Sequence, residues 1–242
     1  MNVGSLKNYG RPYSETMTAL PAAVQKRIRR EGAKVIKKHL GLLGLLRLLF
    51  LTWREKRRML RIDLDPIRRR GLANDRFINF MIQNTAMFSA TVKMVGMDRA
   101  LTIHQEIMDQ VAVPMNEALL PSRSEFERLD DLFGAFRQYM VAFLEAERRA
   151  GLHEYRIVED SDDAIAIDVT YCAFCEIPRH LGIMEACESG CYSDEVFFPR
   201  FLEPVGLRFV RTKTLARKGD HCDFRFERIS AVGSQEAAPE GG

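Results

Sequence analysis

The 242-residue sequence contains few cysteines, and all five lie in its last third. None occurs before residue 172, and the sequence does not open with a cationic segment, an apolar run and a cleavage site. Five is also an odd number, so complete pairing into disulfides is excluded. We therefore expect a cytoplasmic protein of bacterial type with reduced thiols, whose thiol chemistry is confined to residues 169–226.

Long apolar runs are also missing. The apolar stretch from Leu40 to Trp53 has 14 residues and is interrupted by Arg47, whereas a membrane-spanning helix needs about 20. Residues 1–72 carry 18 lysines and arginines against 5 acidic residues, a net charge of +13. We expect this helix to pack in the core or against another subunit of a homo-oligomer. Weak peripheral membrane contact through the same residues is the alternative.

Nucleic acid is not expected as a partner of the basic region. The sequence has no interleaved aromatic residues there, and no helix-turn-helix, zinc-finger or RNA-binding signature. With 46% hydrophobic residues the chain can bury a sizeable core. These features predict a globular protein with a small-molecule substrate.

The hydrophobic periodicity predicts an α+β fold, with a helical N-terminal half followed by a β-β-α-α-β-β antiparallel-sheet unit that carries the cysteines. The predicted helices are 22–40, 40–53, 74–95, 97–111, 124–150, 173–186 and 192–202. The predicted strands are 154–159, 164–171, 207–216 and 221–229. Ser124 and Glu127 fit a capping box at the start of the helix over 124–150.

Four regions follow from this pattern. Residues 1–20 are predicted to be a flexible arm, 21–150 a helical region with a basic first part, 151–230 the α+β catalytic or ligand-binding region, and 231–242 a disordered tail. Residues 21–230 are expected to form one integrated domain.

Cys191 is the candidate nucleophile. It follows Gly190 where a helix is predicted to begin, and the positive end of a helix dipole favours thiolate over thiol. Asp194 lies one turn further on and is the candidate base or amidine ligand. Cys172, at a strand-to-helix junction, and Cys222, on the last strand, complete the candidate catalytic set. Taken singly, each cysteine is more typical of a small buried apolar residue than of a catalytic group.

Zinc binding is the competing interpretation of the cysteines. Cys172-x-x-Cys175 and Cys187-x-x-x-Cys191 approximate a four-thiolate site, to which His221 could add a ligand. The two pairs are separated by only eleven residues and both fall on predicted helices, which suits one tetrahedral site poorly. We therefore predict no metal and no cofactor. His104, a single histidine on a predicted helix, is a candidate to line a pocket.

Several short motifs occur in a characteristic order between residues 165 and 228. They are Val169-Thr170-x-Cys172, Gly182-x-x-Glu185, Cys191-x-x-Asp194, Arg211-Thr-Lys-Thr-Leu-Ala216, Gly219 and Cys222-Asp-Phe-Arg-Phe226. In this combination the chain resembles the L-2-amino-thiazoline-4-carboxylic acid hydrolase family. The resemblance implies a hydrolase that acts on a cyclic amidine at bonds other than peptide bonds, and that turns a thiazoline ring into N-carbamoyl cysteine.

The resemblance also marks candidate site residues. The family's motif positions fall on Cys172, Cys191, Asp194, Arg211, Thr212, Thr214, Gly219 and Cys222. A ring carboxylate needs a cation, and Arg211 or Lys213 is placed in the sequence to supply it. With His221 and His104, these residues from 211 to 214 form the candidate substrate-binding set.

A binding domain without catalysis is the second hypothesis. The order of strands and helices, with cysteines at a strand end and near the C-terminal strand, also resembles the ligand-binding domains of vinyl-reductase type. Such a domain would bind a small molecule, or sense it, without turnover, and its cysteines could hold a metal.

Overall fold

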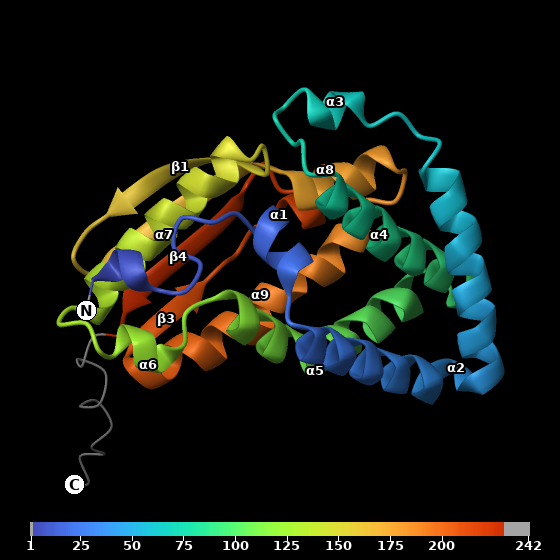
Figure 1. Ribbon diagram of the computed structural model, residues 1–242, viewed down its shortest axis with the longest axis horizontal. Coiled ribbons are helices and arrows are strands. Elements are labelled where there is room, and N and C mark those ends of the chain that lie inside the picture. The colour runs from blue at the N-terminus through green and yellow to red at the C-terminus, as the bar shows by residue number, and fades with distance from the viewer. Residues whose placement is uncertain (1, 230–242) are drawn as a thin grey trace, which may run out of the picture.

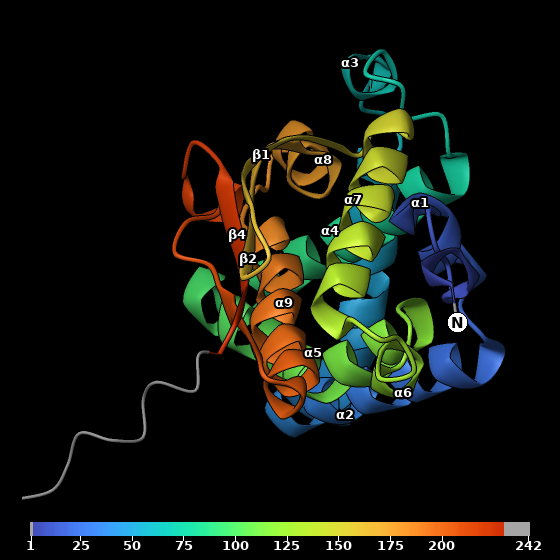
Figure 2. The same ribbon diagram turned by 90° about the vertical axis from the view of Figure 1, so that its left-hand side faces the viewer.

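The computed structural model describes residues 2–229 and has the predicted α+β fold (Figure 1). The helices of the N-terminal half surround one end of the molecule, and an antiparallel sheet forms the other. Figure 2 shows the sheet along one side of the molecule, with α9 and α7 on its inner side. The predicted disordered tail, residues 231–242, lies outside the described residues.

Nine α-helices are present in the described part of the chain. Their bounds are α1 Tyr13–Thr16, α2 Ala22–Met59, α3 Asp65–Arg68, α4 Asp75–Val95, α5 Met97–Leu119, α6 Arg123–Phe126, α7 Leu132–Arg149, α8 Ala173–His180 and α9 Ala186–Leu202. Asn74 caps α4 by accepting a hydrogen bond from the amide of Phe77, at 3.0 Å. The longest amphipathic patterns in the sequence thus correspond to the helices that build the core.

The sheet has the strand order β1-β2-β4-β3, with every neighbouring pair antiparallel. Its strands are β1 His153–Asp160, β2 Ala164–Cys172, β3 Leu207–Val210 and β4 Cys222–Arg228. Phe226 of β4 pairs with Ile165 on one side and with Phe209 on the other. Its ring lies 5.1 Å from the rings of Phe136 on α7 and Phe198 on α9. This aromatic layer fixes both helices against the sheet.

Several predicted boundaries are wrong: α5 continues to Leu119 instead of ending at residue 111, and α8 ends at His180 instead of residue 186. The helix predicted over 124–150 is divided into α6 and α7, and the capping box is formed by Ser122 and Glu125 instead of Ser124 and Glu127. The strand predicted over 207–216 ends at Val210. The last helix begins at Ala186, not at Tyr192, because the helix continues through the Ser189-Gly190 pair. This last difference changes the surroundings of Cys191.

The apolar stretch 40–53 lies within α2, which bends at Gly41, where φ is 69°. Beyond the bend, Leu48, Thr52 and Met59 are buried, whereas the opposite side of the helix faces outward. Core packing therefore accounts for one side of this segment only. None of the described helices is both long and apolar enough to cross a membrane.

The first twenty residues, predicted as a flexible arm, contain short helices and buried side chains. Leu6 packs in the core between sheet and helices, and Tyr13 lies edge-on to Phe143 of α7, with ring centroids 5.0 Å apart. The amide of Tyr13 donates to the carboxylate of Glu147. The segment thus covers the C-terminal half of α7.

Gly151 makes the turn from α7 into β1 that brings Glu147 and His153 together. It has φ of +68°, and a Cβ added there would lie 2.5 Å from the Leu72 nitrogen. Gly182 has a similar φ, +82°, but an added Cβ would meet nothing within 4 Å.

We predict that Gly151→Ala destabilises the protein more than Gly182→Ala. Both substitutions incur the left-handed backbone cost of about 1–2 kcal/mol, but Gly151→Ala also forces two backbone segments apart. Urea unfolding should place Gly151→Ala at least about 2 kcal/mol below Gly182→Ala. Equal losses would show that the close approach at Gly151 does not constrain the fold.

Candidate active site

A cavity of about 1070 Å³ extends between the sheet and the helices. Most of its lining is apolar, and one group of its polar side chains lies where β1 and β4 begin and β2 ends. That polar end is lined by Tyr13, Asn116, His153, Cys172, Cys191, Asp194, Arg211 and Cys222. The candidate catalytic cysteines and Asp194, which lie far apart in the sequence, therefore share one cavity.

Cys172 and His153 are direct cross-strand partners. Cys172 ends β2, His153 begins β1, and the two residues pair in the antiparallel register. Partners in such a ladder project to the same face with Cβ atoms about 4.5–5.5 Å apart. The hairpin register alone therefore sets an imidazole beside a thiol, the pairing that activates cysteine nucleophiles.

Glu147 provides the third member of this group. Its carboxylate is fully buried, and its Oε2 lies 2.8 Å from Nδ1 of His153. Its Oε1 accepts the amide hydrogen of Tyr13 at 2.5 Å. The carboxylate of Glu147 thus links the N-terminal segment at Tyr13 to the imidazole of His153.

The charges around His153 control its protonation. Burial opposes the imidazolium, but the neighbouring Cys172 and Glu147 side chains outweigh it and raise the pKa of His153 to about 10. His153 is therefore an imidazolium at neutral pH. His153 and Glu147 are therefore ion-paired, and with Cys172 beside the imidazolium the three residues form one series inside the cavity.

Asp194 lies on α9 at the same end of the cavity. Nη1 of Arg211 donates to its Oδ2 at 2.7 Å. Burial nevertheless raises the pKa of Asp194, against the lowering effect of Arg211. Arg211 also donates from Nη2 to the Cys191 carbonyl at 2.8 Å and to Glu195 at 3.0 Å, so its guanidinium fixes this part of α9.

The comparisons with known proteins give the family of the chain. The model of the L-2-amino-thiazoline-4-carboxylic acid hydrolase family matches residues 75–226. The chain belongs to this family. The match begins at the start of α4 and ends within β4, so it covers the helices α4 to α7 as well as nearly all of the segment 165–228 in which the motifs occur. No curated protein and no solved structure shows significant similarity to the chain.

The structural reason for choosing Cys191 as the nucleophile is wrong. The residue lies in the second turn of α9 and not at a helix start, so the unpaired amides of the helix end do not reach it. Burial, together with the nearby Cys172 and Asp194, raises the pKa of Cys191 well above its ordinary value. Cys191 is a thiol at neutral pH.

Cys222 is also held as a thiol. It begins β4, and burial raises its pKa to about 11. The amide of Leu215 donates to its Sγ at 3.2 Å, which only partly offsets the burial. Cys222 thus forms part of the cavity wall and anchors the segment after β3.

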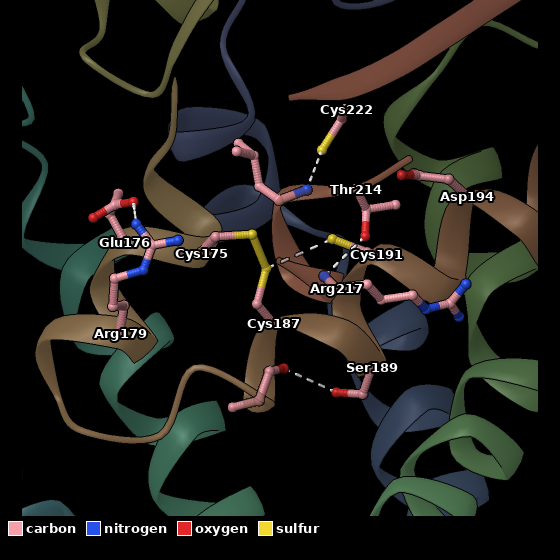
Figure 3. Close-up of a disulfide and its surroundings, with 12 residues drawn as sticks. Cys175, Glu176, Arg179, Cys187, Ser189, Cys191, Asp194, Thr214, Arg217 and Cys222 are labelled. Carbon is pink, nitrogen blue, oxygen red and sulfur yellow. Dashed lines mark hydrogen bonds and ion pairs between the residues drawn. A yellow bond between two sulfur atoms is a disulfide. The ribbon is translucent and has the colours of Figure 1, made fainter. Parts of the chain in front are cut away.

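The remaining two cysteines correct the expectation of reduced thiols. Cys175 on α8 and Cys187 on α9 form a disulfide, and Cys191 Sγ lies 3.6 Å from Cys187 Sγ (Figure 3). The three sulfurs lie within 4.8 Å of one another. Two of them share a covalent bond, so they do not offer the thiolates that a zinc site needs. The disulfide ties α8 to α9 beside the polar end of the cavity.

The predicted substrate-binding residues do not lie together. Arg211 and His104 line the cavity. Thr212 and the Lys213 amide donate to Asp223, Thr214 accepts from the amide of Arg217, and His221 contacts Asp220 and Asp168. These contacts shape the connection between β3 and β4. Their role as substrate ligands stays a prediction.

His104 lies on α5 and is buried between neighbouring helices. Its Nε2 is 3.1 Å from the Thr91 hydroxyl, and its ring packs edge-on to Phe88. Burial lowers its pKa to about 4, so it is a neutral group of the cavity wall.

Sequence reasoning missed His153, Glu147, Tyr13 and Asn116. A signal for His153 was present, because extending the predicted hairpin by one residue pairs it with Cys172. Glu147 lies on the buried side of an amphipathic helix, where a carboxylate is unusual unless it has a partner. Tyr13 donates to Asn116 Oδ1 at 3.2 Å, a contact between segments about a hundred residues apart that no local pattern indicates.

The two buried histidines give a test of these electrostatics. We predict that at pH 7–8 the His153 ring is doubly protonated, whereas the His104 ring is neutral. Nitrogen-15 NMR of the imidazole rings, assigned with His153→Gln and His104→Gln, measures both states. A neutral His153 at pH 7 would contradict the ion-paired series.

The same shift predicts a pH dependence of stability. The folded pKa of His153, about 10, exceeds its ordinary value of 6.5, so its stabilising contribution is complete below pH 6.5 and is lost as the pH rises through about 10. The difference in unfolding free energy between the wild type and His153→Gln should shrink over that interval.

Proposed function

We propose that the protein is a hydrolase that opens a small cyclic amidine resembling 2-amino-thiazoline-4-carboxylate, with Cys172 as its nucleophile. The observation that carries the proposal is the cross-strand pairing of Cys172 with His153, backed by the buried Glu147. Nucleophile, base and orienting carboxylate in contact are the arrangement of cysteine hydrolases in general. The family membership supports the same reaction class.

Asp194 is suited to bind the amidine. A protonated amidine carries a delocalised positive charge with N–H groups that match a carboxylate. Binding this cation would favour the charged form of Asp194, which burial disfavours in the free protein. Charging the ring also increases the electrophilic character of the carbon between nitrogen and sulfur.

The first chemical step is attack of the Cys172 thiolate on that carbon. A new carbon–sulfur bond forms to Cys172, and the ring carbon–sulfur bond breaks. The ring sulfur leaves as a thiolate and takes a proton from His153. The product of this step is an S-linked isothiourea between Cys172 and the opened substrate.

Water completes the reaction. The neutral His153 accepts a proton from a water molecule as the oxygen bonds to the isothiourea carbon. Collapse of this adduct expels the Cys172 thiolate and leaves a urea, the N-carbamoyl form of the opened amino acid. The sum is one substrate plus one water, and the imidazolium–thiolate pair is restored.

Arg211 is a positioning residue in this proposal. Its side chain is only 1% exposed and already holds Asp194 and Glu195. It keeps Asp194 directed into the cavity. Because Arg211 already binds two carboxylates, it is a weaker candidate to bind the substrate carboxylate than its sequence position implied.

The size of the cavity adds a constraint on the substrate. A volume of about 1070 Å³ reaches the upper end of the range of roughly 300–1,000 Å³ typical of pockets for drug-sized ligands. A bare thiazoline ring fills only a small part of it. A ring that carries an apolar substituent fits better. The same observation favours the second candidate function, a small-molecule-binding domain without catalysis, and turnover separates the two.

We predict that Cys172→Ser lowers turnover of an amino-thiazoline carboxylate by about 10³-fold or more, because a serine hydroxyl is a much weaker nucleophile than a cysteine sulfur. Cys191→Ser and Cys222→Ser are the matched controls, since both residues are thiols of the same cavity, and each should retain activity within about tenfold of the wild type. Steady-state kinetics measures all three.

Circular dichroism and thermal unfolding establish that the three variants are folded. A folded Cys172→Ser protein with near-normal turnover would remove Cys172 from the mechanism. Loss of turnover in Cys191→Ser alone would restore the original choice of nucleophile. A wild-type protein that binds the ring without turning it over would favour the binding-domain function.

A further inference from the structure

The outer side of α2 carries a continuous row of exposed apolar side chains. Their exposed fractions range from 50% for Trp53 to 82% for Leu43. We call this row the apolar stripe; it consists of Leu42, Leu43, Leu46, Leu49, Phe50 and Trp53. Contiguous apolar surface of this kind marks an interaction site in most proteins.

The apolar stripe is a distinct face of α2. It does not arise merely because the helix is rich in leucine. Its members recur at spacings of three and four residues and therefore lie on one side of α2. The side that packs against α4 and α5 uses a different set, including Leu48, Thr52 and Met59. Figure 1 shows this half of α2 at the edge of the molecule farthest from the sheet. From residue 42 to 53 the stripe extends about 17 Å at 1.5 Å per residue.

Cations surround the stripe. Between residues 32 and 62 the sole acidic residue is Glu55, which is buried and paired with Lys93 and Arg58. Lys38 is paired with Glu106. Within residues 2–229 no acidic side chain pairs with the remaining exposed cations of this region, which are Lys37, Arg47, Arg54, Arg57 and Arg61.

We propose that the apolar stripe docks on an anionic lipid surface, with α2 lying in the plane of the interface. Apolar burial and attraction of the flanking cations to lipid headgroups add in this position. A second copy of the chain is a poorer partner, because apposing two such faces brings their unpaired cations together. The unpaired cations around the stripe therefore favour an anionic lipid surface over a second copy of the chain.

Trp53 and Arg57 supply an anchor at one end of the stripe. The guanidinium carbon of Arg57 lies 4.2 Å from the Trp53 ring centroid, and the ring of Phe50 stacks at 6.0 Å from that of Trp53. Tryptophan beside arginine suits the boundary between headgroups and acyl chains, since both side chains have an apolar part and a polar part.

Trp53 also makes the proposal directly measurable, because it is the sole tryptophan of the chain. The full-length protein is mixed with vesicles of neutral phosphatidylcholine, or of phosphatidylcholine with anionic phosphatidylglycerol. Co-sedimentation measures binding and tryptophan emission reports the surroundings of Trp53. We expect binding to the anionic vesicles to be about tenfold stronger or more, to weaken as salt is raised, and to be accompanied by a blue shift of the emission.

Three variants separate the contributions. Leu43→Gln/Phe50→Gln removes part of the stripe and should abolish the blue shift. Arg47→Gln/Arg54→Gln should reduce the preference for anionic vesicles. Ile157→Gln/Val158→Gln, which alters exposed apolar residues on β1, is the matched control and should bind as the wild type does.

Two outcomes would overturn the proposal. The first is absent binding, or equal binding to neutral and anionic vesicles. The second is a lipid-free oligomer in which Trp53 is already shielded and which Leu43→Gln/Phe50→Gln converts to monomers, since the stripe would then be a subunit interface. These measurements do not depend on turnover. They therefore test lipid binding independently of the proposed reaction.

Discussion

The pairing of β1 with β2 is the constraint on which the site depends. Its register puts His153 opposite Cys172, and the turn at Gly151 carries the chain from Glu147 to His153 within six residues. A slip of one residue in this register would send one side chain to the other face of the sheet. The aromatic layer around Phe226 holds the sheet against α7 and α9, and so preserves the register indirectly.

Burial gives the cysteines of one cavity different chemistry. An unpaired thiolate is costly in an apolar interior, so Cys191 and Cys222 remain thiols. Cys172 differs because an imidazolium, itself held by Glu147, lies beside it. Cys175 and Cys187 have no free thiol, because they form a disulfide with each other. The proposed choice of Cys172 as nucleophile therefore rests on the partner that each sulfur has, and not on its position along a helix.

The sequence was sufficient for the fold class and the hairpin, because periodicity is a local property. The set Cys172, Cys191, Asp194 and Cys222, which shares one cavity, was marked by the order of the family's motifs. The sequence was misleading at Ser189-Gly190, where weak helix formers suggested a break but tertiary packing of α9 continued the helix. It could not indicate Glu147 and Tyr13 as site residues, since their roles arise from contacts between distant segments. The protonation of a buried thiol depends on such contacts, so local sequence patterns could not predict it.

The central claim is that Cys172 alone forms a covalent bond with the substrate carbon. Rapid quenching of the wild-type enzyme during turnover, followed by peptide mapping by mass spectrometry, tests it most directly. The account predicts an isothiourea adduct, with the mass of the intact substrate, on the peptide that contains Cys172. The same adduct on Cys191 or Cys222, with Cys172 unmodified, would contradict it.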